Sequence, residues 1–121
     1  MSSPQETGRY GERVAAAFLR RHGYRVLTRN FRTERGEIDL VCRHGEVLAF
    51  VEVRARASGG WVRGGESIDA RKEEALREAA RHYLHLLRRD DVTWRFDAVD
   101  IQLTTGAPPV CTLLPDFMED R

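Results

Sequence analysis

The chain has 121 residues, 41% of them hydrophobic and 32% charged, which is ordinary for a folded globular protein. At this length it can bury a core without stabilising metals or disulfides, so we expect a single domain over residues 1–121 with its core at about 8–114. The sequence has no apolar run near the roughly 18 residues of a membrane-spanning helix, and its start lacks a signal-peptide pattern. A cytoplasmic protein without a membrane partner is therefore expected. The two cysteines, Cys42 and Cys111, fit reduced core residues, and a disulfide between them is left open.

The net charge of +1 conceals an uneven distribution. Residues 9–35 hold eight arginines against Glu12 and Glu34, a local net charge of +6, so the remainder sums to −5. A basic segment beside an acidic site suits a polyanionic partner such as nucleic acid. A solvated helix face and an exposed strand edge would give the same count. Arginine supplies nineteen of the twenty basic residues, which leaves Lys72 as the single lysine.

The first half of the chain reads as one helix and three strands. A helix is predicted over residues 8–22, ended by Gly23. Its apolar stripe consists of Tyr10, Val14, Ala15, Phe18 and Leu19. Strands are predicted at residues 24–32, 37–43 and 47–56, and the turns between them are so short that neighbouring strands must be antiparallel.

The second half predicts a loop, a helix and two more strands. Residues 57–66 contain four glycines and Trp61, which is typical of a loop. Asp69 is the expected N-cap of a helix that runs to about residue 89. Its apolar stripe consists of Leu76, Ala79, Tyr83 and Leu87. Strands follow at residues 93–103 and 110–114, with a short acidic tail from Pro115. The order α-β-β-β-α-β-β predicts an α/β domain with a central mixed sheet flanked by helices.

Two carboxylates interrupt apolar strands. Asp39 lies in the run Gly-Glu-Ile-Asp-Leu-Val, and Glu52 lies in the run Phe-Val-Glu-Val-Arg. Asp and Glu are depleted in strands, and two carboxylates on adjacent strands can ligate a divalent cation such as Mg²⁺ or Mn²⁺. Strand alternation allows Asp39 and Glu52 to lie diagonally close on one face of a hairpin. Two solvent-facing carboxylates are the ordinary alternative.

Two further charged residues are candidates for the same site. Lys72 is in line with the apolar stripe of the second helix, so it is expected to point toward the sheet, either for a specific role or by snorkelling past the core edge. Glu12 lies at the margin of the apolar face of the first helix, where it could supply a third carboxylate or form a salt bridge with an arginine. Zinc-type Cys/His spacing, Walker loops and Gly-x-Ser-x-Gly elbows are absent from the sequence, which disfavours nucleotide-dependent and triad chemistries.

Seven motifs in one order resemble the YraN-like family of small bacterial proteins, over about residues 8–103. They are Gly8-x-x-Gly11-Glu12-x-x-Ala15, Gly23-Tyr24, Arg29-Asn30-Phe31-Arg32, Gly36-Glu37-Ile38-Asp39-Leu40-Val41, Phe50-Val51-Glu52-Val53-Arg54-x-Arg56, Lys72 and Phe96-Asp97. That family looks like a member of the restriction-endonuclease-like, PD-(D/E)XK nuclease superfamily and is similar to archaeal Holliday junction resolvases. The resemblance implies a restriction-endonuclease-like fold.

The resemblance also implies a chemistry. Asp39 and Glu52 match the metal-binding acids, and Glu12 matches the helix glutamate of the resolvases. The expected activity is Mg²⁺- or Mn²⁺-dependent hydrolysis of phosphodiester bonds in DNA or structured nucleic acid, with the ion held by both acids and the Val53 carbonyl. Arg54 and Lys72 would orient water or stabilise charge. The residues expected to grip the nucleic-acid backbone are Arg9, Arg29, Arg32 and Arg56.

One position departs from the family pattern. The family has lysine two residues after the glutamate, where this chain has Arg54. A guanidinium stays protonated and cannot act as a general base, although it can stabilise transition-state charge or hold a phosphate. A catalytically weak or inactive nucleic-acid-binding module is therefore the alternative function. A structural partner without nucleic-acid affinity is a third, and a homodimer is left open.

Overall fold

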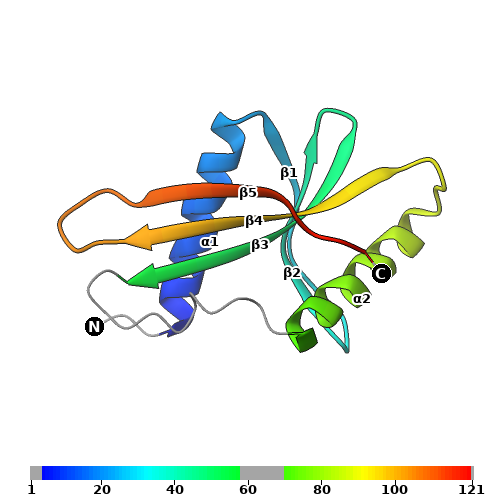
Figure 1. The fold of residues 1–121 in the computed structure, drawn as a ribbon, viewed down its shortest axis with the longest axis horizontal. Coiled ribbons are helices and arrows are strands. Elements are labelled where there is room, and N and C mark those ends of the chain that lie inside the picture. The colour runs from blue at the N-terminus through cyan, green and yellow to red at the C-terminus, as the bar shows by residue number, and fades with distance from the viewer. Residues whose placement is uncertain (1–3, 58–69, 121) are drawn as a thin grey trace.

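The computed structural model describes residues 4–57 and 70–120, with side chains from residue 8. It contains two helices and five strands in the predicted order (Figure 1). They are α1 (Pro4–Arg21), β1 (Tyr24–Arg32), β2 (Glu37–His44), β3 (Val47–Ala57), α2 (Ala70–Leu87), β4 (Thr93–Leu103) and β5 (Val110–Met118). The predicted loop at 57–66, apart from its first residue, and the predicted N-cap Asp69 lie outside the described residues.

The five strands form one mixed sheet in the order β1-β2-β3-β4-β5. Neighbours are antiparallel except β3 and β4, which run parallel over their whole length. Parallel strands need a crossover connection, and α2 lies in the connection between these two. The predicted mixed α/β architecture is thus confirmed. Within the described residues, the helices are too short or too polar to cross a membrane.

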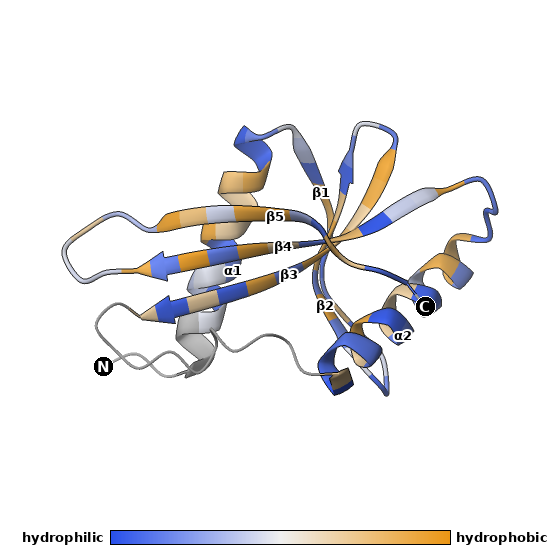
Figure 2. Ribbon diagram, viewed as in Figure 1, coloured by the Kyte–Doolittle hydropathy of each residue, from blue (hydrophilic) through white to orange (hydrophobic). Residues whose placement is uncertain are grey.

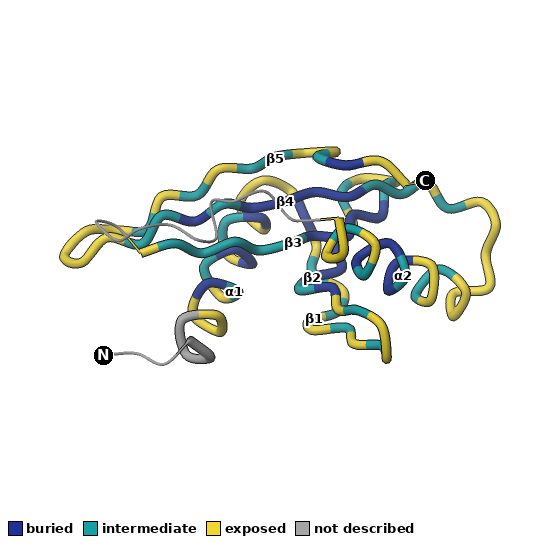
Figure 3. The backbone as a smooth tube through the Cα atoms, turned by 60° about the horizontal axis from the view of Figure 1, so that its bottom comes forward, coloured by how far each residue is buried: buried dark blue, intermediate teal, exposed yellow. Residues whose placement is uncertain are grey.

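The two helices pack on opposite faces of the sheet. Because successive side chains of a strand point to opposite faces, each helix contacts every second residue of β3. On one face, Ala15, Ala16 and Leu19 of α1 lie in a cluster with Ala49 and Val51 of β3. On the other face, Leu76, Ala79 and Ala80 of α2 cluster with Leu48 and Phe50 of the same strand. The sheet twists strongly, so that β1 and β2 descend between the helices (Figure 3).

Two glycines permit close approach of elements to the sheet. A Cβ atom on Gly11 of α1 would lie 3.1 Å from the Ala55 Cβ atom, so α1 packs tightly on β3 there. Tyr10, which was predicted for this stripe, is instead 41% exposed. A Cβ atom on Gly36 would lie 2.0 Å from the Ala75 carbonyl oxygen. The β1–β2 turn therefore rests directly on the backbone of α2.

The predicted ends of α1, α2 and β5 differ from the structure by two residues or more. Helix α1 begins at Pro4 rather than Gly8. Proline is well tolerated in the first turn of a helix. Helix α2 ends at Leu87, because Arg88 has a left-handed φ of 56°. The last strand continues to Met118 instead of ending at Leu114.

A bulge explains why the last strand is longer than predicted. Leu114 pairs with Ala98 and Met118 pairs with Phe96, so residues 115–117 face one residue of β4, Asp97. Asp116 adopts a left-handed φ of 52°, and its N–H donates to Asp97 Oδ1 at 2.8 Å. Proline is tolerated at bulges and on edge strands. The supposed tail is therefore part of the sheet.

Candidate metal and nucleic-acid site

Asp39 and Glu52 lie on neighbouring strands where the β2–β3 ladder ends. The last pairs are Val41–Phe50 and Leu40–Val51, so Asp39 and Glu52 are the next residue on each strand, one step beyond the last pair. The Val53 N–H donates to Asp39 Oδ2 at 2.8 Å. At this point the Val53 N–H is thus bonded to the Asp39 side chain and not to a backbone carbonyl of β2.

Burial and the negative charges around Asp39 and Glu52 raise the pKa values of both carboxyl groups. Burial raises the pKa of the Asp39 carboxyl to about 8, and the negative charge of Glu52 raises it as well, against the Val53 N–H, which lowers it. Burial also raises the pKa of the Glu52 carboxyl, whereas the charge of Lys72 opposes that rise. A bound divalent cation would remove the cost of ionising two partly buried carboxylates together.

Lys72 and Glu12 both act on this pair through their charges. Lys72 is exposed rather than buried under the helix, yet its positive charge is the largest influence that lowers the pKa of Glu52. Glu12 is partly buried on α1, and its negative charge contributes to the raised pKa of Asp39. In the described part of the chain, however, groups of three or more His, Cys, Asp or Glu side chains placed to hold a metal are absent. The arrangement fits a two-carboxylate site near Glu12, not a preassembled three-carboxylate one.

Arg54 lies between the acid pair and a third carboxylate. Its charge lowers the pKa of Glu52, while its Nη1 atom lies 3.8 Å from Asp100 Oδ1 on β4. Arg56 reaches the other oxygen of Asp100, with Nη2 at 3.7 Å from Oδ2. The guanidinium of Arg54 also lies over the Phe117 ring, 5.2 Å from its centroid. Arg54 and Arg56 thus share one acidic partner.

The other arginines assigned to nucleic-acid contact lie elsewhere on the surface. Arg9, Arg29 and Arg32 are exposed, on α1 and β1. Arg32 Nε is paired with Glu37 Oε2 at 2.7 Å. Their exposure is compatible with a backbone-gripping role, but Arg56 alone of this set lies with Arg54 on β3.

Asp97 belongs to a separate, buried network. It is 0% exposed and accepts hydrogen bonds from the Tyr24 hydroxyl at 2.7 Å and from Arg95 Nε at 2.9 Å. Arg95 Nη2 also donates to His44 Nδ1 at 3.0 Å. Because these residues come from β1, β2 and β4, the network joins the sheet across three strands. We interpret it as structural.

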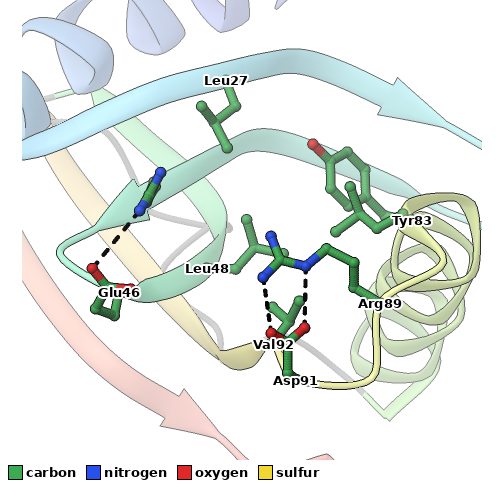
Figure 4. Close-up of a pocket in the computed structure, with 9 residues that line it drawn as sticks. Leu27, Glu46, Leu48, Tyr83, Arg89, Asp91 and Val92 are labelled. Carbon is green, nitrogen blue, oxygen red and sulfur yellow. Dashed lines mark hydrogen bonds and ion pairs between the residues drawn. The ribbon is translucent and has the colours of Figure 1, made fainter.

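A pocket of about 280 Å³ lies at the other end of α2 (Figure 4). Leu48, Tyr83 and Val92 line it, and its two arginines are already paired. Arg43 is paired with Glu46 and Arg89 with Asp91. Since α2 rises about 1.5 Å per residue, its lining residues near Leu87 lie about 22 Å along the helix from Lys72. This pocket is therefore distinct from the acid pair.

Asp100 is a residue that the sequence did not single out. Its place beside Arg54 follows from the parallel register of β3 and β4, in which Arg54 pairs with Asp100. The alternation of β4 signalled only that Asp100 shares a face with Phe96. The strand to which β4 would pair, and in which register, carries no local sequence signal.

Both cysteines are free thiols. Cys42 lies in the α1-side core and Cys111 packs against it, as expected for reduced core residues. Burial raises the pKa of the Cys42 thiol to about 12, so this thiol is unsuited to nucleophilic chemistry.

Comparison with known proteins places the chain in a family. Residues 11–101 match the uncharacterised protein family UPF0102. A UPF0102 protein of Anaeromyxobacter dehalogenans is 44% identical over 106 residues, covering 88% of this chain and 79% of the relative. Relatives from Chlorobium phaeobacteroides and Koribacter versatilis are 39% and 37% identical, covering 83% and 93% of this chain and 79% and 80% of their own lengths. These matches confirm the YraN-like family expected from the motifs: the chain belongs to the uncharacterised protein family UPF0102.

Proposed function

We propose that this protein is a Mg²⁺- or Mn²⁺-dependent nuclease that hydrolyses phosphodiester bonds in DNA or structured nucleic acid. The observation that carries the proposal is the partly buried pair Asp39 and Glu52 on neighbouring strands, whose carboxyl pKa values are both raised. Structural carboxylates are normally paired with cations or exposed. Two that crowd each other at the end of a ladder mark a functional site.

Each residue has a proposed role. Asp39 and Glu52 would hold the divalent ion, which supplies a water of lowered pKa and neutralises the phosphate. Asp39 is oriented for this by the Val53 N–H. Lys72 and Arg54 would stabilise negative charge that develops on the phosphate, because both already act electrostatically on Glu52. Under this proposal the sheet and its two helices form the restriction-endonuclease-like fold.

The competing function is a nucleic-acid-binding module that has lost turnover. Arg54 favours it, because a guanidinium cannot take a proton from water and because Asp100 and Phe117 already engage this side chain. Such a module would keep both the metal and the nucleic-acid affinity.

A cleavage panel tests the proposal. Single-stranded, duplex, flapped and four-way DNA would be incubated with the protein and Mg²⁺ or Mn²⁺, with EDTA as the metal-free control. Asp39→Asn should abolish cleavage by removing an anionic ligand. Glu46→Gln, which alters a side chain 95% exposed in the β2–β3 turn, should leave it unchanged.

Arg54→Lys decides between the two functions. An ammonium at this position restores the family pattern, so the variant should cut at least as fast as the parent protein in single-turnover assays. If Asp39→Asn cuts as fast as the parent, the cleavage does not come from this site. If no variant cuts any substrate, Arg54→Lys included, while DNA is still bound, the binding module is the correct function.

A further inference from the structure

A polar patch occupies the ends of β3 and β4 on the face away from α1. Val53 and Ala55 of β3 contribute to the α1-side cluster, so Arg54 and Arg56 project from the opposite face. Hydrophilic bands on both strands interrupt the apolar sheet there (Figure 2). We call Arg54, Arg56 and Asp100 the arginine clamp.

The clamp is incompletely bonded. Its two ion pairs span 3.8 and 3.7 Å, which is too long for hydrogen bonds. The Nε atoms of both arginines and Oδ1 of Asp100 are buried without a hydrogen-bond partner among the described residues. Buried donors left unpaired are costly and uncommon. The side chains of Arg54 and Arg56 are only 16% and 26% exposed, so water satisfies them poorly.

We propose that Arg54 and Arg56 together bind one backbone phosphate of a nucleic acid, and that Asp100 is the anion this phosphate displaces. The inference rests on the proposed function, because it takes the ligand to be nucleic acid. A guanidinium presents its Nε–H and Nη–H donors as a planar fork that matches phosphate oxygens. Two such forks face Asp100 at distances too long for hydrogen bonds, whereas the two anionic oxygens of an incoming backbone phosphate are not fixed to the sheet and can approach both forks.

Position on the strand sets which phosphate is bound. Residues two apart on one face of a strand are separated by about 6.6 Å, so Arg54 lies one such step beyond Glu52 and Arg56 two. The clamp therefore binds the phosphate next to the one at the acid pair, and Arg54, the nearer of the two arginines, acts on the reacting phosphate only through its charge. The Phe117 ring lies 5.2 Å from the guanidinium carbon of Arg54 and supports this side chain through a cation–π contact.

Asp100 weakens binding while it keeps the arginines in place. In the free protein its charge offsets the mutual repulsion of two guanidiniums. Once a phosphate enters, the same carboxylate is a like charge beside it and opposes the bound state. Removal of this charge should therefore tighten nucleic-acid binding.

Metal-free binding of a short fluorescein-labelled duplex DNA, followed by anisotropy across a salt series in EDTA, tests the clamp. Arg54→Gln/Arg56→Gln should shallow the log–log salt dependence by about 0.9, the value for one phosphate, rather than by about 1.8 for two. Asp100→Asn should tighten binding by about tenfold. Asp91→Asn is the matched control, since it makes the same charge change and releases Arg89 beside the distinct pocket, and its effect should stay below about twofold.

Two outcomes would overturn the clamp. One is a double variant whose log–log salt dependence is unchanged, or is shallower by the amount for two phosphate contacts instead of one. The other is an Asp100→Asn variant that binds no more tightly than Asp91→Asn. None of these readouts uses cleavage, so a protein that binds duplex DNA as predicted but never cuts it overturns the nuclease and not the clamp.

A measurement on the unmodified protein covers the case in which Arg54→Gln fails to fold. The arginine Nε–H signals in ¹H–¹⁵N spectra report directly on the Nε–H donors of Arg54 and Arg56. On addition of unlabelled duplex in EDTA, the Arg54 and Arg56 signals should shift while the Arg89 signal stays. Arg56→Gln, at the less buried of the two arginines, and Arg54→Lys provide the assignment. Signals of Arg54 and Arg56 that remain in place at saturating DNA would overturn the proposal.

Discussion

Asp39→Asn should stabilise the metal-free protein, although it removes a group proposed to be essential for activity. Burial and the charge of Glu52 penalise an ionised carboxylate at this position, and an uncharged amide escapes that penalty. The amide introduced in place of the carboxylate can still accept the Val53 N–H through its carbonyl oxygen, so the bond at the end of the ladder is kept. The expected gain comes from electrostatics alone.

Its magnitude follows from the pKa of Asp39. The carboxyl pKa rises from an ordinary 3.8 to about 8 on folding, and each unit between 3.8 and the working pH costs about 1.36 kcal/mol. At pH 7 the penalty is at most about 4 kcal/mol, and solvent screening lowers the expected gain to about 2 kcal/mol. Because the pKa is higher in the folded state, the Asp39 carboxyl carries no penalty on folding below about pH 4, where it is protonated in both states. The stability of the folded state relative to this limit is lost as the pH rises toward about 8.

Urea unfolding in EDTA between pH 5 and 8 measures this effect. The free energy of unfolding of the parent should fall across that range relative to that of Asp39→Asn. Glu46→Gln, at a side chain 95% exposed, should follow the parent within about 0.5 kcal/mol. Mg²⁺ or Mn²⁺ at pH 8 should stabilise the parent and not Asp39→Asn. If Asp39→Asn is less stable than the parent at pH 8 without metal, the electrostatic reasoning is refuted.

Two further predictions concern the scaffold. Gly36→Ala should lower the free energy of unfolding by about 2 kcal/mol or more in urea, because its Cβ atom would lie 2.0 Å from the Ala75 carbonyl oxygen; Gly8→Ala, with open space around its Cβ atom, should be neutral or stabilising, and equal effects would contradict the close approach. Tyr24→Phe should cost about 1–3 kcal/mol, since the hydroxyl bonded to Asp97 is lost. Ultraviolet titration of the parent should find a phenol with a pKa of about 12 that is missing from the variant, and a full set of ordinary phenols would argue against the buried bond.

Much of the fold was predictable because its signals are local. Short turns fixed β1, β2 and β3 as antiparallel neighbours, and the apolar periods of both helices identified most of their buried faces, although Leu87 at the end of α2 is 38% exposed. The exceptions depend on contacts distant in sequence. Tyr10 fits the apolar period of α1, but Gly11 is what permits the helix to approach Ala55. Pro115 reads as the end of a strand, yet the N–H of Asp116 bonds to the buried Asp97 and carries β5 onward.

The candidate site also combines residues that local sequence signals identified with one that depends on a contact distant in the sequence. Asp39 and Glu52 belong to one hairpin, so alternation allowed them to share a face, whereas the end of the ladder just before them required the structure. Lys72 acts on Glu52 through its charge, because the close approach of the Gly36 turn to Ala75 holds the first turns of α2 beside the sheet. Asp100 could not be foreseen, because its partnership with Arg54 depends on a parallel pairing set by the crossover through α2.

Arg54 is best understood through this unforeseen partner. A lysine at the same position would present one compact charge, which could serve either Glu52 or Asp100. A planar guanidinium can lie over Phe117, face Asp100 with one nitrogen and still lower the pKa of Glu52. The Arg54 guanidinium thus links the acid pair to the polar patch on β4, which a lysine of the same charge could not do at both partners at once. Asp100 and Arg54 should therefore be treated as one unit, and a double-mutant cycle of Arg54→Lys with Asp100→Asn should give non-additive DNA affinities.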